Sequence, residues 1–262
     1  MRKLKTKYEY IKVEKKNKIS IITLNRPKSL NALNRKMIYE IVDQLEKNDY
    51  DSSIRLSIIK GNKKAFAAGA DIEEMMEETP LSFELTDPFS VWDRLMSIRK
   101  PIIASVSGYA LGGGFELALH CDMIIASEDA RFGFPEVNLG VMPGAGGTQL
   151  LTKIIGKRQA FEWISLGKQM KAQKANELGI VNKVVSSELL EEETIRIATS
   201  LANQPPIAVR LIKEAVNIAE DTTLRKGLKL ERKNFYLTFD SYDQKEGMKA
   251  FIEKRSPNFK GK

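Results

Sequence analysis

A strand-to-helix turn near the middle of the chain reads Gly108-Tyr109-Ala110-Leu111-Gly112-Gly113-Gly114-Phe115-Glu116. It follows Ile102–Val106, an apolar, β-branched run that predicts a buried strand, and it leads into a predicted helix over Phe115–His120. Glycines at a helix start let a ligand approach the backbone, whose unpaired N–H groups and dipole favour negative charge. The turn therefore predicts an anion-stabilising site, an oxyanion hole, with the Glu116 carboxyl close behind it.

Two more glycine-rich turns follow predicted strands. The first reads Ala67-Ala68-Gly69-Ala70-Asp71-Ile72 and also carries a carboxylate. The second begins Phe132-Gly133-Phe134-Pro135-Glu136 and ends in Pro143-Gly144-Ala145-Gly146-Gly147-Thr148, another glycine-rich helix start. No turn has the G-x-G-x-x-G spacing or a following Gly-Lys-Ser/Thr, so dinucleotide and P-loop sites are not expected. Taken singly, each turn could be only a tight connection.

Periodicity elsewhere indicates an α/β architecture. Further buried strands are predicted at Ile19–Leu24, Ile54–Lys60, Met123–Ala126 and Ile180–Val185. Apolar residues recur every three to four positions from Leu33 to Leu45, which predicts a helix with Asn31 as its N-cap. From about Ser187 the strand signals stop, and helical stretches broken at Pro205-Pro206 and near Asp240-Ser241 predict an all-helical last third.

The segment Asp71–Asp93 interrupts this pattern. It is rich in Glu and Met and contains Pro80 and Pro88, so we expect a mobile, partly helical excursion. A mobile segment beside a site often acts as a lid. An exposed acidic helix without a role is an equal alternative.

Composition indicates a globular protein of one domain, or one domain with a small helical appendage. The 262 residues are 42% hydrophobic and 29% charged. No window approaches the roughly 20 apolar residues that span a bilayer. The start, Met1 to Lys12, lacks the apolar run of a secretion signal. We therefore expect a cytoplasmic protein without a targeting segment or a membrane partner.

Single copies of cysteine and histidine restrict the chemistry. Cys121 alone cannot form an internal disulfide and fits a reducing compartment. His120 alone cannot build a two-histidine metal site, and a nucleophile–His–Asp triad would have to pass through it. We interpret both residues as the end of a packed helix and expect no metal.

The charge balance favours polyanionic partners without choosing among them. Net charge is +8, from 42 Lys plus Arg against 34 Asp plus Glu. Nucleic acids and a nucleotide cofactor with several phosphates both fit this sign. The basic residues are dispersed, and neither an aromatic-flanked RNA-binding signature nor a Cys/His finger is present. We therefore do not expect a nucleic-acid partner.

The order and spacing of the three turns resemble the crotonase (enoyl-CoA hydratase/isomerase) family. The matching stretches are Phe66–Ile72, Gly108–Glu116 and Phe132–Gly147. Shorter matches near the two ends are Asn25-Arg26-Pro27, Asn31-Ala32-Leu33, Glu246-Gly247-Met248, Ala250-Phe251 and Glu253-Lys254-Arg255. The resemblance covers essentially the whole chain.

The resemblance implies an α/β fold with a crotonase-like superhelical core of repeated ββα turns. Residues 1–195 would form this core with the active site. Residues 196–262 would form a C-terminal helical segment for oligomerisation and part of the coenzyme A (CoA) site, in a homotrimer or a homohexamer built as a dimer of trimers. The implied substrate is an acyl-CoA thioester, so CoA is part of the substrate and no separate cofactor is expected.

By motif position, the resemblance assigns the oxyanion hole to the backbone N–H groups of Ala70 and Gly113. Negative charge develops on the thioester oxygen when the α-carbon becomes enolate-like, and preorganised donors stabilise it by roughly 3 kcal/mol each. Glu136 would be the principal acid/base at the α-carbon and Glu116 its water-positioning partner. Two adjacent carboxyls in different protonation states can add water near neutral pH.

The resemblance also implies contacts to CoA. The expected contacts, beyond Ala70 and Gly113, are Lys28, Leu30, Ala68, Asp71, Ile72, Gly112 and Lys254. Lys254 would lie near the CoA phosphate and reach across to a neighbouring subunit, whereas Lys28 has a surface lysine as its equal alternative. Four aromatic residues could line the acyl pocket or belong to the core: Phe89, Trp92, Trp163 and Phe251.

Both glutamates together favour an enoyl-CoA hydratase acting in fatty-acid metabolism, which adds water to a 2-trans-enoyl-CoA and gives a 3-hydroxyacyl-CoA. A binding or scaffolding relative that has lost catalysis is disfavoured, because both carboxylates are present. Two alternatives stay open. One is a 3,2-enoyl-CoA isomerase or another lyase of the family, using the same oxyanion hole. The other is a crotonase relative that binds RNA. Residue types alone do not specify the acyl chain.

Overall fold

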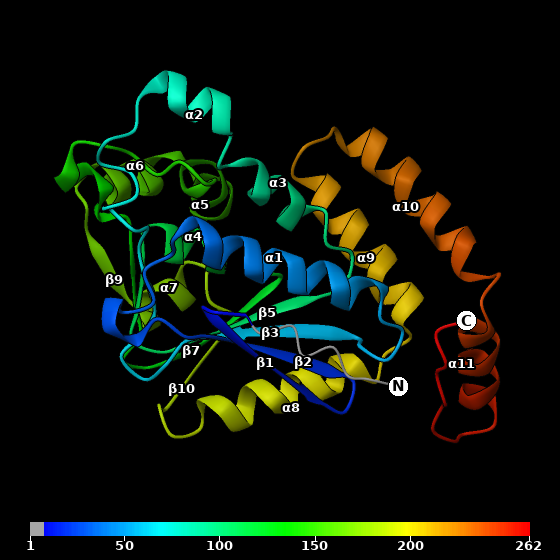
Figure 1. The fold of residues 1–262 in the computed structure, drawn as a ribbon. Coiled ribbons are helices and arrows are strands. Elements are labelled where there is room, and N and C mark those ends of the chain that lie inside the picture. The colour runs from blue at the N-terminus through cyan, green and yellow to red at the C-terminus, as the bar shows by residue number, and fades with distance from the viewer. Residues whose placement is uncertain (1–7) are drawn as a thin grey trace.

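Two β-sheets carry the fold (Figure 1). The computed structural model describes residues 8–262; residues 1–7, part of the start in which no secretion signal is expected, lie outside the described residues. The larger sheet contains, in spatial order, β1 (Ile11–Lys16), β2 (Ile19–Leu24), β3 (Leu56–Lys60), β5 (Ile102–Val106), β7 (Met123–Ser127) and β10 (Lys183–Val185). The smaller sheet contains β4 (Ala65–Ala68), β6 (Tyr109–Leu111), β8 (Arg131–Gly133) and β9 (Gln169–Lys171).

Helices surround the two sheets and make up the C-terminal part of the chain. Those of the first two thirds are η1 (Pro27–Ser29), α1 (Arg35–Tyr50), α2 (Pro80–Thr86), α3 (Ser90–Met96), α4 (Gly113–Leu119), η2 (Pro135–Leu139), α5 (Gly147–Ile155), α6 (Lys157–Ser165) and α7 (Ala172–Glu177). Those of the last third are α8 (Leu190–Ala202), α9 (Pro206–Ala219), α10 (Leu224–Thr238) and α11 (Tyr242–Ile252). None of the helices within residues 8–262 has the length and apolar character needed to cross a membrane.

Within the larger sheet, β2, β3, β5 and β7 are buried on both faces, which explains their unbroken apolar runs. From β2 to β10 its strands are parallel. In β3, Ile59 packs into the core that contains Met37 of α1, whereas its neighbour Ile58 packs with Ala198 of α8. Successive residues of a strand point to opposite faces, so each face needs its own cover. Figure 1 shows α1 on one side of this sheet and α8 on the other.

Each central strand of the larger sheet is followed by a short strand of the smaller one. The pairs are β3 with β4, β5 with β6, and β7 with β8, which confirms the expected ββα repeat. β4, β6 and β8 are parallel neighbours, and Ala68, Leu111 and Gly133 lie side by side in their register. The three glycine-rich turns therefore begin at the same edge of the smaller sheet.

Most predicted elements are confirmed. The strands Ile19–Leu24 and Ile102–Val106 have the expected bounds, α9 begins at Pro206, and Ser241 is the N-cap of α11. Two features were missed. β1 is basic and exposed apart from Ile11, so it has no apolar run, and the strands of the smaller sheet are only three or four residues long.

Asn31 is not the N-cap of the first long helix. That cap is Asn34, whose side chain accepts a hydrogen bond from the Met37 N–H. Asn31 has a left-handed φ of 56° and is 0% exposed. Its side chain accepts from the Arg26 N–H at 2.9 Å and donates to two carbonyls of β4, those of residues 65 and 66, at 3.1 Å each. Asn31 therefore ties the early loop to β4.

The segment after β4 is partly helical, as expected. α2 is exposed, whereas α3 packs on the core through Val91, Trp92 and Leu95. The mobility of this segment stays a prediction.

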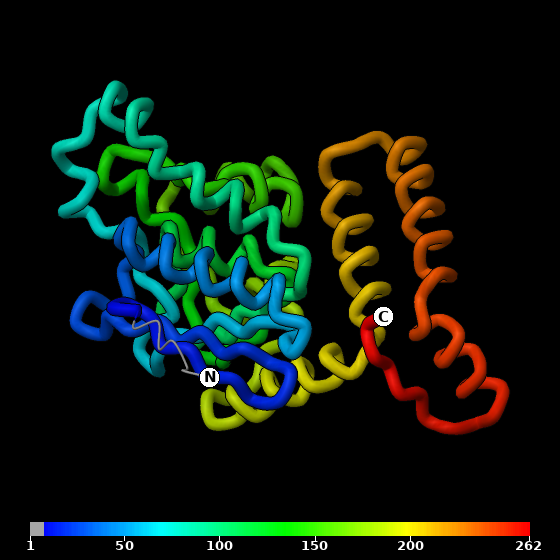
Figure 2. The backbone as a smooth tube through the Cα atoms, turned by 45° about the vertical axis from the view of Figure 1, so that its right-hand side comes forward, coloured from blue at the N-terminus to red at the C-terminus, as the bar shows by residue number. Residues whose placement is uncertain are grey.

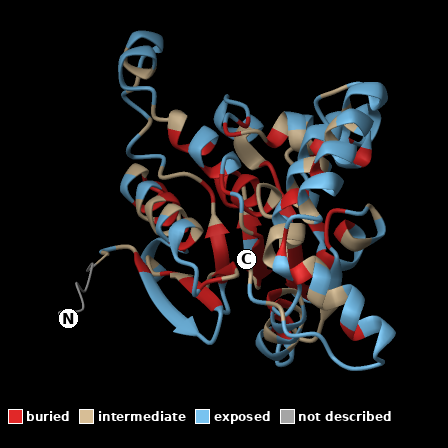
Figure 3. Ribbon diagram, turned by 90° about the vertical axis from the view of Figure 1, so that its right-hand side faces the viewer, coloured by how far each residue is buried: buried red, intermediate tan, exposed pale blue. Residues whose placement is uncertain are grey.

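The C-terminal helices are arranged as two parts. α8 packs on the larger sheet, and α9, α10 and α11 stand to one side of the sheets (Figure 2). Their outer faces are largely exposed (Figure 3). The domain boundary expected at residue 195 falls inside α8, so the division into residues 1–195 and 196–262 stays a prediction.

Replacing Asn31 with Ala should lower the free energy of unfolding by about 3 kcal/mol, because three hydrogen bonds of the Asn31 side chain, to Arg26, Ala65 and Phe66, are lost. Urea unfolding of the two proteins measures this difference. Asn17→Ala is the matched control, since Asn17 also has a left-handed φ, of 55°, but lies exposed. An equal, small effect of both substitutions would contradict the anchoring role of Asn31.

Candidate active site

The turn after β4 leaves one backbone N–H without an acceptor. The Leu33 N–H donates to the Gly69 carbonyl at 2.8 Å, and the Asp71 N–H donates to the Leu33 carbonyl at 2.9 Å. In such a parallel bridge the residue between the two bonded peptides directs its own N–H away from the partner strand. That residue is Ala70. In the part of the chain that the structure describes, its N–H has no hydrogen-bond acceptor.

A second N–H without an acceptor among residues 8–262 lies beside the first. Gly113 is the first residue of α4, where an N–H has no acceptor within the helix. A Cβ atom at Gly113 would lie 3.5 Å from the Ala70 nitrogen, so the two backbones approach closely. Ala70 and Gly113 therefore offer two neighbouring donors, and their role as an oxyanion hole stays a prediction.

The flanking glycines explain why no side chain separates these donors. Gly112 has a left-handed φ of 49°, and a Cβ atom there would lie 2.8 Å from Oε1 of Glu136. A Cβ atom at Gly114 would lie only 2.0 Å from the Ala67 carbonyl oxygen, so α4 contacts β4 through bare backbone. The three consecutive glycines thus bring α4 against both β4 and Glu136.

The carboxyl of Glu116, a residue of α4, is held by backbone N–H groups at the start of α5. It is 3% exposed, and its Oε1 accepts hydrogen bonds from the Ala145 N–H at 2.7 Å and the Gly147 N–H at 2.8 Å. Burial raises the pKa of Glu116, and the two N–H donors oppose that rise without cancelling it. One carboxyl oxygen is therefore fixed, and the other is left for a ligand.

Glu136 has the opposite environment. Its Oε2 is buried, and among residues 8–262 no group forms a hydrogen bond to it. Burial raises the pKa of Glu136 to about 7, and the charge of Glu116 adds to the rise. A half-buried carboxyl that titrates near neutral pH, and whose Oε2 lacks a partner among the described residues, is suited to carry a proton to or from a bound molecule.

Most of the expected CoA contacts gather around the Ala70 turn. Leu30 accepts a hydrogen bond from the Ala68 N–H through its carbonyl, and Lys28 lies two residues earlier in the exposed helix η1. Ile72 is exposed beside the turn. The Asp71 carboxylate is paired with Arg26 at 2.8 Å, so it holds this loop together. Their contacts with CoA stay predictions.

Lys254 does not join this group. It follows α11, which lies well to the side of the β4 turn in Figures 1 and 2. The prediction that Lys254 serves a neighbouring subunit is compatible with this position and stays a prediction.

The four aromatic candidates separate. The Phe89 ring packs against Gly144, where a Cβ atom would lie 3.2 Å from it. Trp92 belongs to the core, and Trp163 packs partly buried against it. Phe251 is 85% exposed on α11. Phe89 therefore contacts the loop that holds Glu116.

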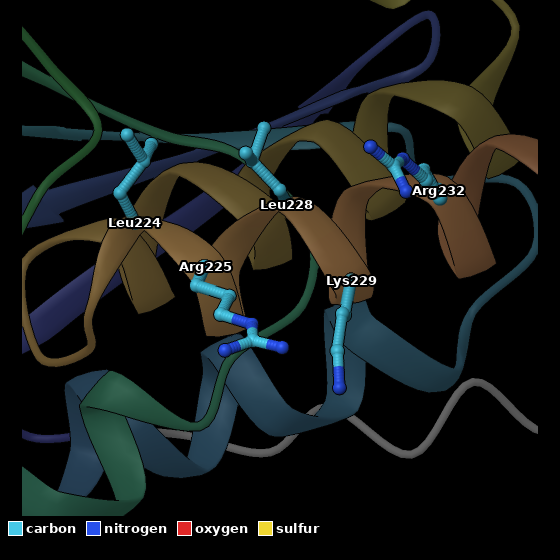
Figure 4. Close-up of a pocket in the computed structure, with 5 residues that line it drawn as sticks. All are labelled: Leu224, Arg225, Leu228, Lys229 and Arg232. Atoms are coloured by element: carbon cyan, nitrogen blue, oxygen red, sulfur yellow. The ribbon is translucent and has the colours of Figure 1, made fainter.

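A hollow on α10 is unrelated to this site. It has a volume of about 420 Å³ and is lined by five side chains of that helix, shown in Figure 4: Leu224, Arg225, Leu228, Lys229 and Arg232. It contains no carboxyl group, and α10 lies apart from α4 (Figures 1 and 2). Among residues 8–262, no three His, Cys, Asp or Glu side chains are placed to hold a metal ion.

Sequence reasoning missed several supporting residues. These are the N–H donors of Ala145 and Gly147, the ion pair of Arg26 with Asp71, and a 2.8 Å contact between His120 Nε2 and the Ala145 carbonyl oxygen. The glycines around Ala145 were a usable signal, because a glycine-rich helix start offers N–H groups to a carboxylate.

Comparisons with known proteins agree with this geometry. Residues 14–262 match the family model described as "Enoyl-CoA hydratase/isomerase". A "Probable enoyl-CoA hydratase, mitochondrial" of Dictyostelium discoideum is 48% identical over 95% of this chain and 90% of its own length. The "2,3-dehydroadipyl-CoA hydratase" of Escherichia coli (strain K12) is 43% identical over 95% of this chain and 98% of its own. A Geobacillus kaustophilus crystal structure, described as "Enoyl-CoA Hydrates Subunit I", superposes with a TM-score of 0.96 at 56% identity, covering 97% of this chain and 99% of the other.

The raised pKa of Glu136 predicts a pH-dependent stability. This carboxyl ionises near 4.5 in an unfolded chain and near 7 in the folded one, so between these values the folded protein binds more protons. The free energy of unfolding therefore falls as the pH rises through this window. Solvent screening of the partly exposed group reduces the effect to about 2 kcal/mol.

The Glu136→Gln variant lacks this ionisable group. The difference between its free energy of unfolding and that of the unmodified protein should therefore grow by about 2 kcal/mol in favour of the variant as the pH rises from 4.5 to 7. Urea unfolding at several pH values measures the difference. Parallel pH profiles of the two proteins would show that Glu136 ionises normally.

Proposed function

The chain belongs to the enoyl-CoA hydratase/isomerase family, and from its site we propose that it adds water to a 2-trans-enoyl-CoA. The product is a 3-hydroxyacyl-CoA. One observation supports this most strongly: the buried, unpartnered Oε2 of Glu136 lies on a carboxyl that closely approaches Gly112, immediately before the free N–H of Gly113. The chain is an enzyme, an enoyl-CoA hydratase.

The two free N–H groups bind the thioester oxygen. Ala70 and Gly113 donate to it, and the bond to each strengthens as the α-carbon becomes enolate-like and charge moves to the oxygen. Neither donor needs to rotate, because Ala70 is fixed by its bridge to Leu33 and Gly113 by the start of α4. The site is thus organised before the substrate binds.

The carboxyl pair handles the water. Glu116, fixed through Oε1, accepts a hydrogen bond from the attacking water with its other oxygen. The water oxygen bonds to the β-carbon, one of its protons passes to the carboxyl pair, and Glu136 delivers a proton to the α-carbon. The pair begins and ends with the same number of protons. Because the two groups interact, their titration belongs to the pair.

CoA lies along the loop of η1 and the β4 turn in this proposal. Six residues of the same chain would contact CoA: Lys28, Leu30, Ala68, Asp71, Ile72 and Gly112. Lys254 would come from a neighbouring copy, because α11 lies apart from this loop (Figure 1). A cytoplasmic location is also part of this proposal. Cys121, the single cysteine of the sequence, is a free thiol, which fits a reducing compartment.

An oligomer, either a homotrimer or a dimer of trimers, accompanies this proposal. The C-terminal helices expose large apolar side chains, namely Leu224, Phe235, Tyr236, Phe251 and Ile252. A surface with so many apolar groups is typical of an interface.

The proposed oligomer should have three or six times the mass of one chain, as measured by light scattering after size-exclusion chromatography. Phe235→Asp places a charge on the exposed face of α10 and should reduce that mass, whereas Lys226→Asp on the same helix should leave it unchanged. A monomeric unmodified protein would contradict the oligomer while leaving the hydratase chemistry open.

Hydration of crotonyl-CoA tests the activity directly. The unmodified protein should consume the conjugated thioester absorbance. Glu116→Gln and Glu136→Gln should each lower kcat about 100- to 10,000-fold while CoA binding and folding persist. The exposed Glu128→Gln serves as the matched control and should keep the original rate.

Two results would overturn the hydratase proposal. Migration of the double bond of a 3-enoyl-CoA without hydration of the 2-enoyl form would identify an isomerase. Inactivity on all acyl-CoA substrates together with tight, salt-dependent RNA binding would identify a nucleic-acid-binding relative.

A further inference from the structure

His120, the only histidine of the chain, lies one helical turn after Glu116. Its N–H donates to the Glu116 carbonyl, and its ring packs against Trp92 of α3 at a centroid distance of 5.4 Å. The ring nitrogen Nε2 lies 2.8 Å from the Ala145 carbonyl oxygen. The proposed hydration does not use this ring, so its polar contact needs another explanation.

The contact falls between the two bonds that hold Glu116. The N–H of Ala145 donates to Glu116 Oε1, the carbonyl of Ala145 accepts from His120, and the N–H of Gly147 donates to the same Oε1. Three successive peptide groups of the loop are therefore fixed from α4, two by Glu116 and the middle one by His120.

The loop needs such a restraint because its own sequence is permissive. Gly144, Gly146 and Gly147 surround Ala145, and Gly146 has a left-handed φ of 106°. Glycine backbones visit many conformations, so each N–H would aim at Oε1 for only part of the time without further contacts. A Cβ atom at Gly146 would lie 3.1 Å from His120 Nε2, so the ring also limits the space around the turn.

The protonation of the ring follows from its partners. A carbonyl oxygen only accepts, so Nε2 carries the hydrogen. Burial lowers the pKa of His120, while the Ala145 carbonyl and the charge of Asp93 in α3 oppose that shift. The ring is therefore neutral at neutral pH, and its donor remains in place over the range in which the carboxyl pair works.

We propose that His120 is a positioning residue for Glu116. Its Nε2–H donates to the Ala145 carbonyl, and this hydrogen bond, the pin, fixes the peptide between Ala145 and Gly146. The pin thereby keeps the N–H groups of Ala145 and Gly147 aimed at Glu116 Oε1. This inference rests on the proposed hydratase function and assigns a role to a residue outside the reacting groups. Loss of the pin would let the carboxyl of Glu116 turn, which misplaces the attacking water.

Two substitutions separate this role from simple packing. His120→Met fills similar space against Trp92 but cannot donate to the Ala145 carbonyl. His120→Gln places an amide N–H close to the original Nε2 position and can donate. His120→Asn is the matched control for polarity, because its amide is one carbon too short to reach.

Steady-state hydration of crotonyl-CoA should then show a specific pattern. His120→Met and His120→Asn should lower kcat about 10- to 100-fold with KM changed less than about threefold, because misplacement affects the reaction more than CoA binding. His120→Gln should recover kcat to within about threefold of the unmodified enzyme. The acidic limb of the pH profile should move to higher pH in the Met variant, since Glu116 loses the N–H donors that lower its pKa.

Equal kcat values for the Gln, Asn and Met variants would overturn the proposal and assign His120 to packing alone. Where the Met variant folds poorly, the comparison of Gln with Asn decides in the same way.

Hydrogen exchange tests the pin without any catalytic activity. Exchange of the Ala145 and Gly147 amides should accelerate at least about tenfold in the Met and Asn variants and stay slow in the Gln variant. Absence of hydration by the unmodified protein would reject the proposed function, whereas unchanged exchange in all variants would reject the pin.

Discussion

The whole site depends on the close approach of two backbones, that of the β4 turn and that of α4. Their contact is possible only because Gly112, Gly113 and Gly114 have no side chains, and because β4 and β6 are held in register with Ala68 opposite Leu111. Two N–H groups that have no acceptor within the described part of the chain then meet, each fixed by an element that continues into the core. Such donors stabilise a developing oxyanion without reorganising during the reaction.

The two carboxyls gain their different roles from their surroundings. Both are glutamates in a buried region, where an ionised group is disfavoured. Glu116 receives two N–H donors from the start of α5, whereas Oε2 of Glu136 receives none among the described residues, and the pKa of Glu136 rises to about 7. One acid is thus held in place as an acceptor, and the other is free to exchange a proton near neutral pH.

The sequence predicted every strand of the larger sheet except β1, and also the three turns, because apolar runs and glycines are local signals. The smaller sheet escaped prediction, since its strands of three or four residues depend on register with neighbours far along the chain. Asn31 has a residue type that favours N-caps, but its left-handed backbone and burial against β4 give it another task. The donors to Glu116 are backbone groups about 30 residues away; the glycines around Ala145 indicate N–H groups at a helix start, but not which carboxylate these groups bind.

The carbonyl stretching frequency of a bound thioester tests the central claim most directly. A 2-enoyl-CoA labelled with ¹³C at the thioester carbonyl can be bound to a slowly reacting Glu136→Gln variant and observed by isotope-edited infrared spectroscopy. Hydrogen bonds from the Ala70 and Gly113 N–H groups should polarise this bond and lower its frequency below that of the same thioester in water. A frequency equal to or above the value in water would show that these two groups do not hold the oxygen.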